Sequence, residues 1–315
     1  LIMKNFLVFV FIFFSACKNT DLNLTIPYEG DKLVLWGKLK AGEPLRIQVT
    51  KSFNAVGVIP DDITIPNATV VLFKNGKQYV TLSYSADEAG IYVSDSLVEA
   101  GATYIVKASA PTLPEAESMP VLVPAELPEV TIQRTRNVPS GIDQDFPQDL
   151  LNLYFTEQSR QTEQYFTLLL INYYTKDTTS TSLNGTPDNM LVQEEDCHTW
   201  ATEKILSPRI DPISGLMNTP KASVFLMNSK CLPSPEIPVA FYIYSQSFKT
   251  PPETALRTDL KIGVTTKEAF DYAKLEYDQP EGLDLLVLPP QRAITNIKNG
   301  YGLISASNEK TITIP

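Results

Sequence analysis

Between residues 32 and 109, the sequence alternates short runs of β-branched and aromatic residues with clusters of turn-forming residues. Such runs are typical of strands, and no helical periodicity separates them. Asn75 and Gly76 form the pair that closes tight hairpins. Strands at this spacing predict a small β-sandwich. The candidate strands are residues 32–39, 45–50, 68–73, 78–82, 90–93 and 103–108.

Three segments of this region are more specific than the strand pattern. They are residues 66–72, 87–92 and 99–106, with Gly90 and Gly101 at turns and tyrosines near strand starts. In these features the region resembles the transthyretin-like, or carboxypeptidase-regulatory-like, sandwich family. The resemblance implies a module that presents or braces another component and is rarely catalytic.

Prolines recur through residues 110–129, where they favour an extended chain over a regular sheet ladder. We interpret this stretch as an extended edge segment or a connector, and place a domain boundary near Leu127. The predicted first domain is therefore residues 32–127. We expect Trp36, which lies within a candidate strand, to belong to its core.

The predicted second domain, residues 128–315, is also rich in strand signals. One helix is expected over residues 266–277, where Thr266 can cap the first turn and apolar residues share one face. The chain is thus predicted to be mainly β, with two Ig-like or transthyretin-like sandwiches in tandem and one short helix in the second. Its candidate strands are residues 151–155, 165–174, 223–227, 239–244 and 260–264.

The chain opens with the features of a secretory signal. Lys4 precedes an apolar run over residues 6–14, which is far shorter than the roughly 20 residues of a spanning helix. Ser15 and Ala16 then supply the small residues of a cleavage site. We predict a signal peptide over residues 1–16.

The residue after this predicted cleavage site is Cys17, and Ser15–Ala16–Cys17 resembles a bacterial lipobox. The resemblance implies that Cys17 carries acyl chains such as palmitate, which suffice to hold a protein on a membrane. Ordinary secretion with an incidental cysteine is the alternative. Residues 17–31 are polar and are predicted to form a lipidated tether.

Charge and cysteine content limit the possible functions. The net charge is −10, or −11 once Lys4 leaves with the signal, so the surface would repel nucleic acid. Cys197 and Cys231 are expected to form a disulfide, as cysteine pairs of exported proteins usually do. Free thiols or a metal site are the alternatives, but His198 is the single histidine.

The sequence contains little that suggests catalysis. A Ser-His-Asp or Cys-His mechanism needs a histidine base, and His198 directly follows a cysteine expected to be oxidised. Asp143 and Asp145, or the acidic residues 194–196, could serve calcium or hydrolysis, but solvated loop charge is the simpler interpretation. We expect no catalytic residue, no metal and no cofactor.

Toward the C-terminus the sequence resembles a known family. The resemblance rests on Cys197–His198–Thr199–Trp200, the region of Tyr272, and residues 293–306, which include Asn296, Asn299, Gly300 and Tyr301. These features are similar to domain-of-unknown-function family 4249, the lipoproteins of Bacteroidota-type outer membranes. The separation of Cys197 from Trp200 departs from the cysteine–aromatic adjacency of that family.

The resemblance implies a location and a kind of partner. Members are often found alongside TonB-dependent transporters, so we expect a non-enzymatic accessory subunit beside an outer-membrane β-barrel, lipid-anchored and exposed at the cell surface. A free-standing glycan- or peptide-binding module is one alternative, and a subunit of an outer-membrane assembly or secretion complex is another. The expected partner or ligand contacts are Trp200, Asn296, Asn299, Gly300 and Tyr301.

Overall fold

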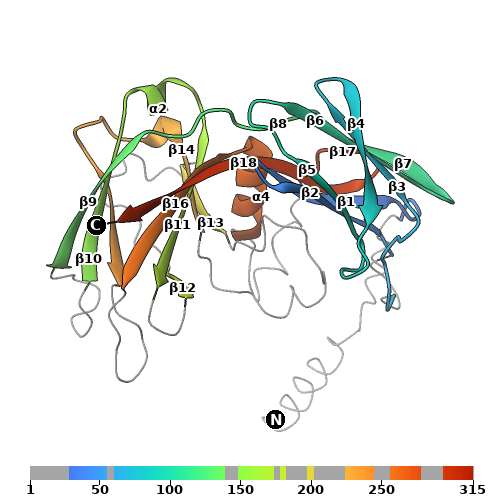
Figure 1. Cartoon of the computed structure of the whole chain (residues 1–315), viewed down its shortest axis with the longest axis horizontal. Coiled ribbons are helices and arrows are strands. Elements are labelled where there is room, and N and C mark those ends of the chain that lie inside the picture. Colours follow the sequence, from blue (N-terminus) through green and yellow to red (C-terminus); the bar gives the residue numbers. More distant parts are fainter. Residues whose placement is uncertain are drawn as a thin grey trace, which may run out of the picture.

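The computed structural model describes residues 28–54, 60–138, 148–173, 178–181, 197–201, 224–244, 256–277 and 294–314. Within these ranges strands predominate, so the prediction of a mainly β protein is confirmed (Figure 1). Cys17, the predicted signal peptide, most of the predicted tether, Asp143, Asp145 and the acidic residues 194–196 lie outside the described residues.

The first half of the chain forms a sheet that folds over a hydrophobic core. Its strands follow the order β1-β2-β5-β4-β3-β6-β7-β17, with β8 paired to β6, and β1 contacts β6 and β7 across the core. We call this unit the first sandwich. Its strands are β1 (Leu33–Lys40), β2 (Pro44–Lys51), β3 (Thr69–Lys74), β4 (Lys77–Tyr84), β5 (Ile91–Leu97), β6 (Thr103–Ala110), β7 (Leu113–Ser118), β8 (Val121–Leu122) and β17 (Ile297–Lys298).

Strand β1 alternates regularly between the two faces of its sheet. Leu33, Leu35 and Leu39 are buried in the core, and Val34, Trp36 and Lys38 lie on the opposite face. Trp36 is one of the residues on that opposite face, so its expected place in the core was wrong. Its ring packs edge-on against Tyr272 of helix α4 (Lys267–Tyr277), with the ring centroids 4.8 Å apart.

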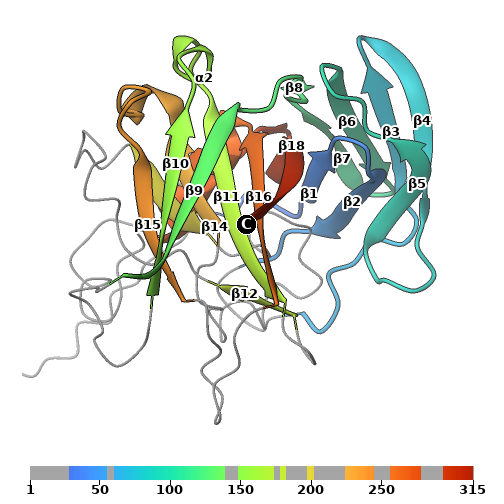
Figure 2. The ribbon, with the colours of Figure 1, turned by 60° about the vertical axis from the view of Figure 1, so that its left-hand side comes forward.

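A second core lies between two sheets, which we call the second sandwich. One sheet has three strands, seen side by side in Figure 2, and the other continues the large sheet of the first sandwich. The three-stranded sheet comprises β9 (Val130–Val138), β10 (Gln148–Phe155) and β15 (Val239–Tyr244), and the facing strands are β11 (Tyr165–Tyr173), β12 (Thr178–Thr181), β13 (His198–Ala201), β14 (Val224–Asn228) and β16 (Arg257–Thr265).

Helix α4 adds a third layer to the second sandwich. Phe166 and Leu168 of β11 face the three-stranded sheet, whereas Tyr165 and Leu169 pack with Phe270 of α4 on the opposite face. The helix predicted over residues 266–277 is therefore confirmed. The described residues also contain a one-turn helix α2 (Gln158–Gln161) and a 3₁₀ turn η1 (Ser229–Cys231) that were not anticipated.

Strand β18 (Tyr301–Ile314) joins the two sandwiches. Its first half pairs in parallel with β1, from Val34–Tyr301 to Lys40–Ser307, and its second half pairs antiparallel with β16. The first core accordingly includes Ile304, and the second includes Ile314. The division into two domains at residues 127 and 128 stays a prediction. The structure adds that one strand, β18, contributes side chains to both cores.

Candidate functional site

Asn296 was expected to contact a partner, but its side chain is used within the fold. The amide Nδ2 donates to the carbonyl oxygen of Ile304 at 2.7 Å, and the Ile304 N–H donates to Oδ1 at 3.0 Å. Asn296 is only 8% exposed, and its own carbonyl accepts from the Met119 N–H at 2.7 Å. This residue clamps the turn between β17 and β18.

The glycines of the same turn allow a close approach to β1. A Cβ on Gly300 would lie 2.6 Å from the carbonyl oxygen of Leu33, and one on Gly302 would lie 2.0 Å from that of Leu35. Gly302 also has a φ of +102°, and Asn299 has a φ of 56°. The glycines of this motif therefore serve mainly to let β18 pack closely against β1.

Tyr301 is the exposed part of this turn. Its side chain is 41% exposed, and the Lys32 ammonium lies 5.4 Å from the ring centroid. The described end of the predicted tether leads into Lys32, and it includes Tyr28, which is 44% exposed. We call Tyr28, Lys32, Asn299 and Tyr301 the tether-root surface. A hydrogen bond to Glu29 raises the pKa of Lys32, which keeps the ammonium charged.

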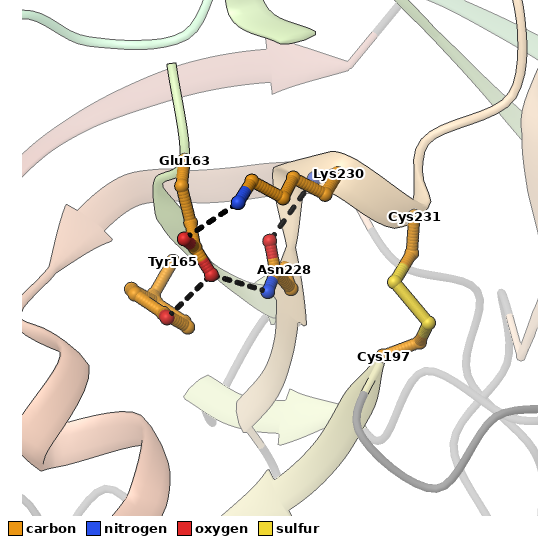
Figure 3. Close-up of a disulfide and its surroundings, with 6 residues drawn as sticks. All are labelled: Glu163, Tyr165, Cys197, Asn228, Lys230 and Cys231. Carbon is orange, nitrogen blue, oxygen red and sulfur yellow. Dashed lines mark hydrogen bonds and ion pairs between the residues drawn. A yellow bond between two sulfur atoms is a disulfide. The ribbon is translucent and has the colours of Figure 1, made fainter.

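The disulfide predicted between Cys197 and Cys231 is present (Figure 3). It ties the start of β13 to the end of η1, with the two Cα atoms 5.6 Å apart. Both cysteines are buried, and the Cys197 carbonyl accepts from the Asn228 N–H at 2.8 Å. The bond therefore braces one end of the large sheet.

His198 and Trp200 follow this disulfide on β13. The His198 ring stacks on Phe225 with the ring centroids 5.5 Å apart. Trp200 pairs in register with Phe225, and its side chain lies outside the described part of the structure. In the sheet order β14, β11 and β16 separate β13 from β18, so the fold does not bring Trp200 to the Asn296–Tyr301 turn.

A cluster of polar side chains surrounds Glu163 near the disulfide (Figure 3). Its carboxylate accepts from Lys230 Nζ at 2.8 Å, from Tyr165 Oη at 2.9 Å and from Asn228 Nδ2 at 3.1 Å. These hydrogen bonds, that of Lys230 foremost, lower the pKa of Glu163 to about 2. Burial and the Glu163 hydrogen bond raise the pKa of Tyr165. Both groups are thus held in one protonation state near neutral pH, which suits a structural role.

A polar cleft of about 500 Å³ lies where the connector passes the turn around α2. One wall is residues 126–129, and the other contains Gln158, Gln161 and Gln164. We call it the connector cleft. No sequence feature singled out these residues, because glutamines and hydroxyl residues in a turn have no distinctive spacing.

The connector wall of this cleft is held in place by neighbouring strands. Lys310 Nζ donates to the Pro128 carbonyl at 2.8 Å, and Asn308 Nδ2 donates to the Ala125 carbonyl at 3.3 Å, both from β18. The Thr156 N–H donates to the Glu129 carbonyl at 3.2 Å, which ties the two walls together. The cleft is therefore built on backbone that is fixed from both sides.

Two further features are absent from the described ranges. Among those residues no group of three or more His, Cys, Asp or Glu side chains is arranged to hold a metal ion. Within the same ranges, no helix combines the length and apolar character needed to cross a bilayer.

The model of a protein family described as "Domain of unknown function (DUF4249)" matches residues 19–313. None of the curated proteins matches the chain.

Proposed function

The chain belongs to the family of the domain of unknown function DUF4249, and from this premise we propose that it is a non-enzymatic lipoprotein of the outer membrane. Acyl chains on Cys17 anchor it, and it faces the cell surface. It acts as an accessory subunit beside a membrane β-barrel, with a TonB-dependent nutrient transporter as the preferred partner.

The observation that carries the proposal is the position of the tether-root surface. Tyr28 and Tyr301 are exposed beside the point where the predicted tether joins β1. Tyr28 comes eleven positions after Cys17, a reach of at most about 35–40 Å at roughly 3.3–3.6 Å per residue. A lipid at Cys17 would keep this surface close to the membrane, and tyrosines are favoured at protein interfaces.

The connection between the sandwiches supports a role as a rigid spacer. Because β18 pairs with β1 and β16 in turn, the two cores share one strand and are not joined by a flexible linker alone. The connector is in addition pinned through Lys310. Such a body can hold a contact surface in a fixed orientation to a barrel.

The test is co-purification of the lipidated full-length protein from outer membranes in mild detergent. We expect a β-barrel protein in the eluate, and we expect Tyr301→Ser to reduce its yield severalfold. Tyr79→Ser is the matched control, since Tyr79 is 40% exposed on β4 of the first sandwich. Cys17→Ala should release the protein from the membrane fraction.

Two results would contradict the proposal. One is an eluate without any barrel, and the other is an equal loss with Tyr301→Ser and Tyr79→Ser. The identity of the barrel also separates the transporter role from a place in an assembly or secretion complex.

A second candidate function, a ligand-binding module, is favoured by the connector cleft.

A further inference from the structure

The connector cleft leaves many of its hydrogen-bonding groups unused. Among the described residues, the side-chain amides of Gln158, Gln161 and Gln164 have no hydrogen-bond partner, and the carboxylates of Glu126 and Glu129 have no ion pair. Carboxylates just outside the cleft differ. Glu157 pairs with Arg160 at 2.8 Å and Glu163 with Lys230 at 2.8 Å. The cleft walls thus offer several hydrogen-bonding groups that the fold itself does not use.

The composition of the walls excludes several ligand classes. Among the described residues that line the cleft there is no lysine or arginine, so phosphate or carboxylate ligands would be repelled by Glu126 and Glu129. The large apolar side chains among these described lining residues are Leu127 and Pro128, which is too little apolar surface for an acyl chain or an aromatic ligand. The volume of about 500 Å³ nevertheless falls within the roughly 300–1,000 Å³ of small-molecule sites.

The groups that remain match a ligand with many neighbouring hydroxyls. A glutamine amide offers one acceptor oxygen and two donor hydrogens, and a carboxylate accepts from two hydroxyls at once. Thr156, Ser159 and Thr162 add hydroxyls that can donate or accept. Leu127 and Pro128 offer a small apolar surface for the C–H face of a sugar ring.

We propose that the connector cleft is a binding site for a neutral oligosaccharide. Gln158 and Gln161 donate to and accept from ring hydroxyls, and Glu126 and Glu129 accept from them on the opposite wall. The bonds from Lys310 to Pro128 and from Thr156 to Glu129 hold the two walls before the sugar arrives. This inference rests on the second candidate function, the ligand-binding module, and binding here does not depend on the membrane anchor or on a barrel partner.

The test uses the full mature chain with Cys17→Ser, which is secreted without lipid, labelled with ¹⁵N. Its probes are hexasaccharides of glucose (α-1,4 and β-1,4), xylose, mannose and N-acetylglucosamine, each titrated to 10 mM. At least one should shift the side-chain amide signals of Gln158, Gln161 and Gln164 in a saturable way. Gln158→Ala with Gln161→Ala should weaken that binding about tenfold or more.

The control variant is Gln78→Ala, because Gln78 is an exposed glutamine of β4 that does not line the cleft. It should bind like the unaltered chain. Absence of saturable shifts with every hexasaccharide would overturn the proposal, as would an equal effect of the cleft and control variants. Spermine serves as a cationic probe, and binding of spermine without any sugar would show instead that Glu126 and Glu129 form a cation site.

Discussion

The two sandwiches differ in how their strands are covered. In β1 of the first sandwich, buried and half-buried residues alternate, because one face packs on the core and the other points outward. In β11 of the second sandwich, residues 165–170 are all buried, because the three-stranded sheet covers one face and α4 the other. A sheet covered on both faces loses the alternating pattern by which strands are recognised.

The sandwiches also differ in what stabilises them beyond their cores. The second has a disulfide at one end of its sheet, whereas the first depends on the close seating of β18 against β1. Because β18 lies in the sheet that the two sandwiches share and contributes to both cores, we expect the two sandwiches to unfold together. Trp36 lies in the first sandwich and Trp200 in the second. The variant Trp200→Phe retains Trp36, whose fluorescence reports on the first sandwich, and the variant Trp36→Phe retains Trp200, whose fluorescence reports on the second.

The largest effect is expected from Gly302→Ala. The residue has a φ of +102°, and a Cβ would lie 2.0 Å from the Leu35 carbonyl oxygen, so β18 must move away from β1. We expect the free energy of unfolding to fall by about 4 kcal/mol or more. Urea denaturation followed with both tryptophan reporters measures it.

Gly42→Ala is the matched control for that variant. Gly42 also has a positive φ, of +78°, but a Cβ at this position would meet nothing within 4 Å. It should cost only about 1 kcal/mol. Equal losses in the free energy of unfolding for the two variants would show that the first sandwich does not depend on the close packing of β18 on β1.

Removal of the disulfide tests the second sandwich. The bond spans 34 residues, for which the chain-entropy estimate is about 3.5–4 kcal/mol. The double variant Cys197→Ala with Cys231→Ala should lose that amount in urea denaturation. Both reporters should shift together, and separate transitions for Trp36 and Trp200 would refute the idea that β18 couples the sandwiches.

Acid should weaken the junction between the sandwiches through Glu309. This carboxylate of β18 accepts from Lys38 at 2.9 Å and lies 3.1 Å from Lys40, both of β1. Burial alone would raise the pKa of Glu309, but the attraction of the two lysines outweighs it and lowers the pKa to about 2. Ionised Glu309 therefore stabilises the fold above pH ~4.5, by about 3 kcal/mol at most, and this is lost as the pH falls toward about 2.

The comparison of the unaltered chain with Glu309→Gln isolates this effect. The difference in their free energies of unfolding should be largest at pH 7 and should shrink between pH ~4.5 and pH ~2. A difference that stays constant over this range would mean that the lysines do not act on Glu309 through its charge.

A smaller loss is expected from Asn296→Ala. The substitution leaves the buried N–H and carbonyl of Ile304 without the partners they have at 3.0 and 2.7 Å. We expect a loss of about 2 kcal/mol in thermal or urea unfolding. Asn299→Gly is the control, since Asn299 has a φ of 56° that glycine adopts freely. An equal loss of stability with Asn299→Gly would contradict the proposal that the hydrogen bonds of the Asn296 side chain hold this turn.

Much of the fold could be predicted from local signals. The Asn75–Gly76 hairpin, the alternation of β1 and the helix near Tyr272 each arise from residues close in sequence. The parallel pairing of β1 with β18 could not be predicted, because strand propensity does not specify a partner at the other end of the chain. Trp36 was misplaced for a related reason, since its contact with Tyr272 of α4, far away in the sequence, could not be predicted from the strand pattern.

The site was predicted less well than the fold. The glycines and asparagines at residues 296–302 stand out in the sequence, but they serve the fold. Asn296 makes buried hydrogen bonds to Ile304, and Gly300 and Gly302 allow β18 to approach β1 closely. The connector cleft draws its walls from residues 126–129 and 156–164, which are brought together by the pairing of β9 with β10. Solvent-exposed glutamines satisfy no folding requirement, so no pattern in the sequence marks them.

The smallest effect on stability is expected from Glu163→Gln, and it sharpens the contrast with Glu309. The pKa of both carboxylates is lowered to about 2, but Glu309 is 15% exposed where β18 pairs with β1, and Glu163 is 40% exposed near the disulfide. Water and salt screen the attraction of Lys230 for Glu163 far more than that of Lys38 for Glu309. In 0.5 M NaCl, Glu163→Gln should leave the melting temperature unchanged, whereas Glu309→Gln should still lower it. Equal losses in salt would mean that burial does not separate the two sites, and that the disulfide corner depends on its charges as much as the junction does.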